Sequence, residues 1–169
     1  MQLKSHFYNI IRILLLFVFV GLLVGCQSVF NPYEGKAVKA HNNIPLLEGG
    51  PHQGVWETSE VSFKYSFVRN SDKLELSGDL ALYAASHWTY ELIDNLFFRV
   101  SFIDSDGKLI DSRVLWSTVY GNYFYQWNLK QRTLDLPPNT AARGFSYMGR
   151  VREAGSQGTE LNLWHSPLG

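Results

Sequence analysis

Apolar and polar residues alternate along much of the chain after residue 60, which is the pattern of β-strands with one buried face. Residues 61–68 alternate in this way, and residues 74–82 resume the alternation. Between them stand Asn70, Ser71 and Asp72, whose side chains satisfy backbone groups in tight turns. The two segments are therefore predicted to form a β-hairpin.

The same alternation continues downstream. Further strands are predicted at residues 96–102, 108–118, 134–136, 145–151 and 159–165. The first two flank the glycine-containing turn 104–107, and only residues 90–95 suggest a turn of helix. About seven short strands at regular spacing predict an all-β fold, a single antiparallel β-sandwich. Its core is predicted to contain Phe63, Tyr65, Phe67, Leu74, Leu76, Leu80, Leu96, Phe98, Val100, Phe102, Phe145 and Tyr147.

The N-terminal segment has a different pattern. Lys4 and Arg12 precede residues 13–25, an apolar run without a charge. This run is shorter than the ~20 residues that span a bilayer. A basic start, a short apolar stretch and small residues at its end are typical of a secretory signal peptide, so residues 1–25 are predicted to be one.

The end of this segment is more specific. The sequence Leu23-Val24-Gly25-Cys26 resembles the lipobox of bacterial lipoproteins, and Cys26 is the only cysteine of the chain. The resemblance implies cleavage before Cys26, diacylation of its thiol and acylation of the new amino group; several acyl chains anchor a protein stably. The residue after the cysteine is Gln27 and not aspartate. In the sorting of enteric-type lipoproteins, the absence of an aspartate at this position implies delivery to the cell outer membrane, on its periplasmic side.

The segment after the cysteine is rich in proline and glycine. Residues 26–53 are therefore predicted to form a lipidated tether, with residues 44–47 as a candidate first edge strand, and residues 54–169 the sandwich domain. About 27 flexible residues have a root-mean-square reach of roughly 30 Å, which would let the domain stand clear of the lipid headgroups.

The sandwich resembles the immunoglobulin-like domains found behind the anchors of bacterial lipoproteins. The resemblance covers roughly residues 61–152: a strand ends in Phe-x-Asp-x-Asp-Gly-Lys at residues 102–108, and Leu136-Pro-Pro-Asn-Thr leads into a later strand. It implies a fold and no chemistry, because such sandwiches have many unrelated functions.

Charge and cysteine content exclude several classes of function. Lys+Arg and Asp+Glu both number 15, and two of the bases lie in the signal peptide, so the remainder carries a net charge of −2. This charge offers no field for a nucleic-acid partner. Lipidation of Cys26 leaves no thiol for a disulfide, a nucleophile or a metal.

Candidate metal and catalytic residues are sparse. Asp104, Asp106 and Asp111 invite a calcium interpretation, but Lys108 and Leu115 occupy the fifth and twelfth loop positions. A metal-free turn is therefore expected, with a looser calcium site closed by residues from elsewhere in the chain as the alternative. The histidines are scattered singly, and no nucleophile elbow or phosphate loop occurs. No cofactor and no enzymatic activity are predicted. An envelope hydrolase remains an alternative, because paired acids leave no spacing signature.

The most unusual stretch is residues 116–127, with six aromatic residues in twelve positions. If it is extended, Tyr123, Tyr125 and Trp127 lie on one side and Phe124 on the other. Such rings can bind a protein partner, stack on sugars or contact a membrane interface, or the stretch can be a loop folded over the open end of the sandwich. The predicted role is non-catalytic binding or support of an envelope protein, with a carbohydrate- or peptidoglycan-binding module as the alternative. The predicted partner-binding residues are Trp116, Tyr120, Tyr123, Tyr125 and Trp127.

Overall fold

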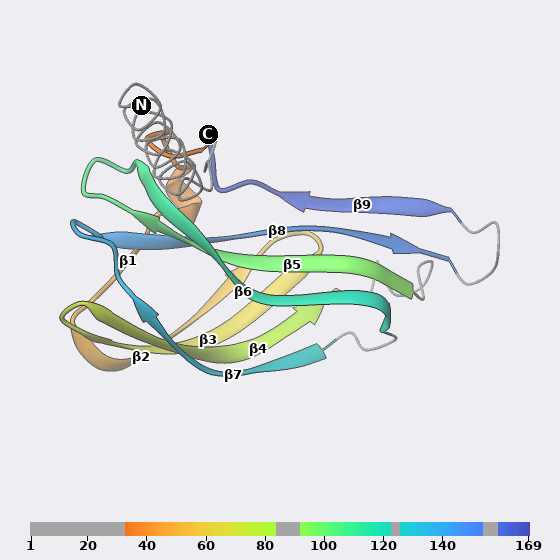
Figure 1. The fold of residues 1–169 in the computed structure, drawn as a ribbon, viewed down its shortest axis with the longest axis horizontal. Helices are drawn as coiled ribbons and strands as arrows, with labels where there is room; N and C mark the ends of the chain where they lie inside the picture. The colour runs from red at the N-terminus through yellow and green to blue at the C-terminus, as the bar shows by residue number, and fades with distance from the viewer. Residues whose placement is uncertain (1–32, 84–91, 123–125, 154–158) are drawn as a thin grey trace, which may run out of the picture. The chain divides into compact units, whose positions relative to one another are not determined.

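The structure of this protein is a computed structural model that describes residues 33–83, 92–122, 126–153 and 159–169. These residues belong to one compact unit, Tyr33–Gly169. The described ranges hold nine strands in two antiparallel sheets that pack as a sandwich (Figure 1), which confirms the predicted fold class with nine strands in place of about seven. Besides a short 3₁₀-helix, η1 (Ala40–Asn42), the elements are β1 (Ile44–Pro45), β2 (Gly49–Glu57), β3 (Val61–Asn70), β4 (Lys73–Leu82), β5 (Leu92–Ile103), β6 (Leu109–Asn122), β7 (Gln126–Asp135), β8 (Ala142–Arg152) and β9 (Glu160–His165).

The two sheets have different strand orders. Sheet I runs β8-β5-β6, and β1 and β9 both pair with β8. Sheet II runs β2-β3-β4-β7. In immunoglobulin-like sandwiches strand B lies beside E in one sheet and C beside F in the other, and here β4 lies beside β7 and β5 beside β8 in the same way. The hairpin strand β6 stays in the sheet of β5, as the additional C′ strand of variable-type domains does.

The core lies between the sheets, and every core residue predicted from the alternation is buried. Phe98 of β5 is at its centre, with 0% of its surface exposed. Its ring centroid lies 4.9 Å from that of Phe63, 5.7 Å from Phe145 and 5.9 Å from Trp56. Rings from both sheets therefore interlock at one point, which joins the two layers.

The strand predictions are confirmed where the alternation is regular. β3 and β4 pair from Val61↔Leu82 to Asn70↔Lys73 across a tight turn, as expected. Two predictions are wrong. Residues 92–95 are the start of β5 and not a helical turn, and the short strand predicted at 134–136 is the end of the ten-residue β7, which stops at Asp135. Both strands contain a shift in pairing register, within residues 93–95 of β5 and between Leu129 and Arg132 of β7, and this shift interrupts the alternation by which a strand is detected in the sequence.

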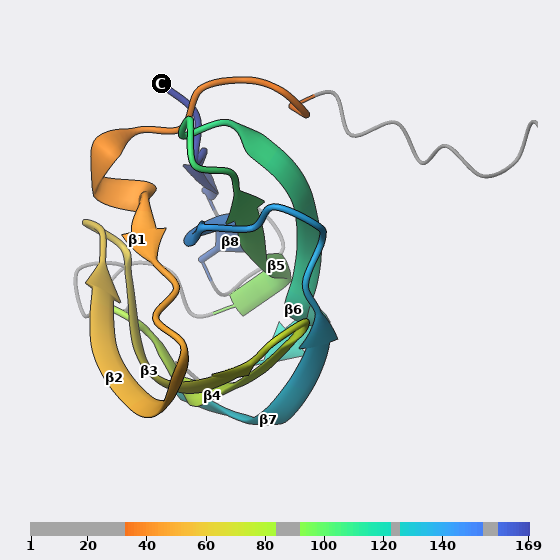
Figure 2. The ribbon, with the colours of Figure 1, turned by 90° about the vertical axis from the view of Figure 1, so that its left-hand side faces the viewer.

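The predicted boundary at residue 54 also requires correction, because the compact unit begins at Tyr33. Residues 33–46, which we call the N-terminal strap, run along the end of the sandwich that faces the viewer in Figure 2. Within the strap Asn42 is 0% exposed, Leu46 is buried in the core, and β1 pairs with β8 through Ile44↔Arg143. Residues 33–53 are thus not tether, whereas the candidate edge strand at 44–47 is confirmed for its first two residues, Ile44–Pro45.

Arg143 of β8 helps to hold the strap. Its side chain is 1% exposed, and its guanidinium carbon lies 3.9 Å from the ring centroid of Phe67 and 4.8 Å from that of Tyr65. Burial lowers the pKa of this guanidinium. Its Nη1 donates a hydrogen bond of 3.1 Å to the carbonyl oxygen of Pro45, so cation–π contacts and β1 together accommodate the buried cation.

Asp104, the first aspartate of the turn between β5 and β6, has a structural role in that turn. Asp104 Oδ1 accepts hydrogen bonds from the backbone N–H groups of Asp106, at 2.9 Å, and Lys108, at 2.8 Å. Gly107 has a φ of +77°, the left-handed conformation that favours glycine. The Asp104 carboxylate thus stabilises the turn by binding backbone N–H groups within it.

Candidate functional site

An apolar row crosses the outer face of sheet I. Trp164 of β9 pairs with Met148 of β8, and Met148 pairs with Phe97 of β5. Directly paired residues point to the same face of a sheet, and their neighbours Leu163, Tyr147 and Phe98 point into the core, so the row faces outward. Trp164 is 68% exposed and Met148 50%, while Phe97 is partly buried. We call these three residues the Trp164 row.

Two exposed valines of β6 extend this apolar surface. Val119 is 60% exposed and Val114 47%, and they pair with Asn95 and Arg99 of β5. Among the described residues on the strands of sheet II, one large apolar side chain, that of Val55, is exposed to a similar extent. Exposed apolar side chains thus gather on one of the two faces, as at surfaces that bind a partner.

Charged groups border the row and largely neutralise each other. Arg150 Nε lies 3.3 Å from one carboxylate oxygen of Asp94, and Arg152 Nε lies 2.7 Å from the other. Arg150 also lies 3.3 Å from Glu160. A row of Trp, Met and Phe with a charged rim has the composition of a protein-binding patch, in which aromatic residues, Met and Arg are enriched.

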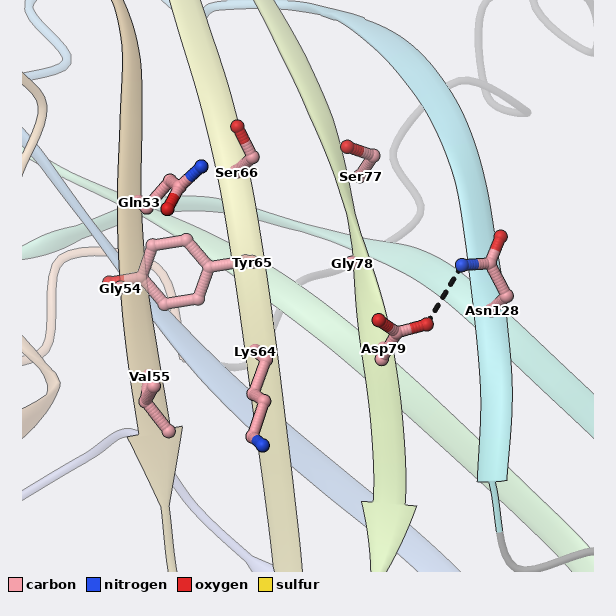
Figure 3. A pocket seen from close by; sticks show the side chains of 10 residues that line it. All are labelled: Gln53, Gly54, Val55, Lys64, Tyr65, Ser66, Ser77, Gly78, Asp79 and Asn128. Atoms are coloured by element: carbon pink, nitrogen blue, oxygen red, sulfur yellow. Dashed lines mark hydrogen bonds between the residues drawn. The ribbon is translucent and has the colours of Figure 1, made fainter.

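The outer face of sheet II is hollowed instead by a shallow groove of mixed polar and apolar lining, drawn in Figure 3. It has a volume of about 530 Å³ and crosses β2, β3, β4 and β7. Its lining residues are Gln53, Gly54, Val55, Lys64, Tyr65, Ser66, Ser77, Gly78, Asp79 and Asn128.

Polar and apolar groups both line this groove. Asn128 Nδ2 donates a hydrogen bond of 2.8 Å to Asp79 Oδ1, so the carboxylate is turned toward β7 and away from Lys64 on the other neighbouring strand (Figure 3). Tyr65 is only 8% exposed, so its ring offers no stacking surface. The lining contains the cation Lys64 and a single carboxylate, that of Asp79, whereas glycoside hydrolysis uses a pair of carboxylates.

The predicted aromatic stretch does not form one strand. Trp116 lies on β6 of sheet I and Trp127 on β7 of sheet II, so the chain passes from one sheet to the other within the stretch. Their ring centroids are 4.5 Å apart with an interplanar angle of 39°, and both rings are partly buried against the core. This pair closes the sandwich between β6 and β7 and is not a coplanar exposed platform.

The remaining predicted site residues cannot be placed in this surface. Tyr123 and Tyr125 lie outside the described residues, as does Cys26. Tyr120 lies in β6, but its side chain is not among those that the structure describes. Among the predicted site residues whose side chains the structure describes, Trp116 and Trp127 are brought together.

A network of polar side chains connects the strap to the C-terminal segment. Trp56 Nε1 donates to Asn42 Oδ1 at 2.9 Å, and Asn42 Nδ2 lies 3.0 Å from His165 Nε2. The indole N–H only donates, so the amide oxygen of Asn42 is the acceptor and its NH₂ group donates to His165. His165 Nε2 is therefore unprotonated in this arrangement.

Beside His165, Tyr147 joins the network to the β2–β3 turn. Its ring stacks on that of His165 at 5.7 Å, and its hydroxyl donates to Glu60 Oε2 at 2.5 Å and lies 3.0 Å from Thr58 Oγ1. Burial and the Glu60 carboxylate raise the pKa of Tyr147. For Glu60, burial opposes ionisation, but hydrogen bonds from Tyr147 and Ser59 outweigh it and lower the pKa. These groups connect the strap, the C-terminal segment and the β2–β3 turn. They do not form a nucleophile–base arrangement.

This network predicts a loss of stability in mild acid. Burial, with the charges of His41 and Lys39, lowers the pKa of His165 below its ordinary value of 6.5, while Glu60 opposes the shift. The unfolded chain then binds this proton more readily, so the His165 contribution is full above about pH 6.5 and falls as the pH drops through the folded-state pKa. The melting temperature is expected to decrease from pH 7.5 to 5.5.

The comparison variant is His165→Gln, whose amide oxygen accepts from Asn42 without titrating. It should flatten this part of the pH profile, whereas His52→Gln, outside the network, should not. An equal pH dependence in wild type and His165→Gln would contradict the assignment.

Comparisons add no relative to this picture: neither the models of known protein families nor the curated proteins contain a match to the chain. No helix among the described residues is long and apolar enough to cross a membrane. The described part of the chain also holds no group of three or more His, Cys, Asp or Glu side chains placed to bind a metal ion.

Proposed function

We propose that this protein is a lipoprotein of the cell outer membrane, anchored by acyl chains on Cys26, whose periplasmic sandwich domain binds an envelope protein without catalysing a reaction. The lipobox sequence Leu23-Val24-Gly25-Cys26 supports the anchor and its location. The observation that carries the binding role is the Trp164 row. Trp is among the residue types that concentrate binding energy at interfaces, and 68% of Trp164 is exposed.

The anchor is tested by Cys26→Ser. Without the thiol, diacylation and the processing that follows it are lost, and the protein is expected to accumulate unprocessed or to leave the outer-membrane fraction. Fractionation and mass spectrometry of the purified chain measure both effects. A serine variant that is cleaved before residue 26 and retained in the outer membrane at wild-type yield would contradict the proposal.

The binding role is tested by replacing Trp164 and Met148 together with Ser. Both side chains are largely exposed, so stability should change by less than about 0.5 kcal/mol for each. Crosslinking of the intact lipoprotein in membranes should lose the partner that the wild-type protein captures. Val55→Ser, on the opposite face and 56% exposed, is the matched control and should retain it.

The aromatic stretch is a second proposed contact for the same partner. Tyr123→Ser combined with Tyr125→Ser tests it in the same crosslinking experiment. Loss of the partner in this variant alone would move the binding surface from the Trp164 row to the stretch, and retention in both double variants would refute both surfaces.

The second candidate function is binding of a glycan, such as peptidoglycan, and the groove on sheet II favours it. Its amide and hydroxyl groups from Gln53, Ser66, Ser77 and Asn128 are suited to sugar hydroxyls. Titration with soluble peptidoglycan fragments should then shift the melting temperature, and Ser77→Trp, which fills the groove, should abolish the shift. Unchanged melting at saturating fragment concentration would exclude this function.

A further inference from the structure

The distance between the proposed anchor and the folded unit is short. The unit begins at Tyr33, so only residues 27–32 separate it from Cys26. Seven Cα–Cα steps span at most ~25 Å in any conformation. Their root-mean-square reach as a flexible chain is roughly 14 Å, about half of what a tether of 27 residues would provide.

The strap leaves Tyr33 little freedom to extend this reach. Gly35 N donates to the carbonyl oxygen of Leu109 at 2.8 Å, and Val38 N donates to that of Gly107 at 2.9 Å. On its other side, Lys39 N donates to Pro167 O at 2.9 Å. The strap is thus bonded between the start of β6 and the C-terminal segment, and it cannot serve as additional tether while the unit is folded.

Strand directions divide the unit into two ends. The first, which we call the strap end, contains the strap together with the turns 71–72 and 104–108. The opposite far end contains the start of β3 at Val61 and the start of β7 at Gln126. The 14-residue β6 runs from the strap end to the far end, and at ~3.3 Å per residue it covers roughly 45 Å, more than the tether can reach.

We propose that the strap end of the sandwich is held against the bilayer that contains the Cys26 acyl chains, and that the far end points away from the membrane. This inference rests on the lipid anchor of the proposed function. It concerns the posture of the domain, which neither the lipobox nor the fold specifies separately.

The chemistry of the strap end fits a lipid interface. Tyr33 is 44% exposed, and Lys36 Nζ lies 5.4 Å from its ring centroid. Lys39 and Lys108 are exposed beside them, and aromatic and long basic side chains of this kind are accommodated among lipid headgroups. The exposed acids Glu34 and Asp106 and the partly buried Asp104 balance these lysines in number, so the tether and not a charge attraction must hold this end.

Neither outer face of the sandwich is suited to lie flat on the membrane. Sheet II would have to desolvate Lys64, Asp79 and the other polar groups of the groove, which is unfavourable without new partners. Sheet I would cover the Trp164 row and exclude the proposed protein partner. The upright posture leaves both faces accessible from the periplasm.

Headgroup quenching measures this posture directly. The full-length lipidated protein is reconstituted into vesicles of phosphatidylethanolamine and phosphatidylglycerol that contain a headgroup-nitroxide lipid. Single cysteines replace Lys108 at the strap end, Ser77 in the middle of sheet II and Gln126 at the far end, and each carries the same fluorophore. The acylated sulfur of Cys26 does not react with the label.

Quenching is expected to be several-fold stronger for the Lys108→Cys label than for the Gln126→Cys label, with Ser77→Cys between them. Unfolding curves of the labelled variants verify that all three are folded. Equal quenching at the three positions, or stronger quenching at Gln126→Cys, would overturn the posture.

A variant with a lengthened tether tests whether the short tether is what holds the strap end at the membrane. Insertion of 24 Gly and Ser residues between Pro32 and Tyr33 should remove most of the quenching at Lys108→Cys, because the reach rises to roughly 30 Å. Undiminished quenching would show that the strap end binds lipid by itself and would refute the tether argument. Failure of the lipid anchor is distinguished from both outcomes, because the protein would then lack the acyl mass and would not float with the vesicles.

Discussion

Phe98→Ala is expected to lower the free energy of unfolding by about 3–5 kcal/mol, which is a large part of the stability of a single domain. Phe98 is 0% exposed and contacts Phe63 of sheet II as well as Phe145 of its own sheet. Removal of its ring leaves a cavity where the two layers meet, and rigid neighbouring rings cannot collapse fully into it.

Urea unfolding of the chain from residue 27 onward measures this loss. The matched control is Val119→Ala, which also removes apolar atoms but from a side chain that is 60% exposed, and it should change stability by about 0.5 kcal/mol or less. A Phe98→Ala midpoint equal to that of the control would remove Phe98 from the core.

Asn42→Leu is expected to destabilise the protein by about 2–4 kcal/mol, because it leaves two polar groups without their partner. Asn42 is 0% exposed, accepts from Trp56 Nε1 and donates to His165 Nε2. Leucine has nearly the same size but can form neither bond. The loss of these bonds should also release the strap, because Asn42 is the strap residue whose side chain is completely buried.

Hydrogen exchange of the strap amides, together with urea unfolding, distinguishes local from global effects. Gly35, Val38 and Lys39 donate the bonds that fix the strap, so their amides should lose protection in Asn42→Leu before those of β5. Asn43→Leu is the control, because Asn43 is exposed and adjacent. Equal stability of the two variants would show that the buried amide contributes nothing.

Much of the fold was predictable because strand alternation is a local property. Phe63, Tyr65 and Phe67 had to share one face once their segment was extended, and burial of that face followed from their apolar character. The hairpins of β3–β4 and β5–β6 were predictable for the same reason, with a turn signal between two alternating segments.

Prediction failed where backbone irregularity or distant contacts decide the structure. The register shift between Leu76 and Gly78 in the β4–β7 pair puts a run of exposed polar residues, 130–133, in the middle of β7, so the alternation at its start is too short to mark a strand of ten residues. The strap looked like a tether because its burial depends on Asn42 and Leu46, single residues whose partners lie far along the chain.

The candidate surface shows the same division. Residues 97, 148 and 164 have no spacing that relates them, and only the pairing of β9 with β8 and of β8 with β5 places them in one row. The one signal in the sequence was the alternation of residues 160–165, which predicts that Trp164 and Leu163 face opposite sides without indicating which is exposed.

The sequence by itself determined that the chain after its N-terminal segment is a β-sandwich and which side chains share a strand face, because both follow from a period of two residues along the backbone. The four adjacent residues on which the proposed lipid anchor rests, Leu23-Val24-Gly25-Cys26, are also visible in the sequence alone. Tertiary structure alone decided that the unit starts at Tyr33, that Trp116 and Trp127 close the edge between two sheets, and that the Trp164 row is exposed. These features depend on which strands become neighbours, and neighbours are selected by packing between segments that lie far apart in the chain.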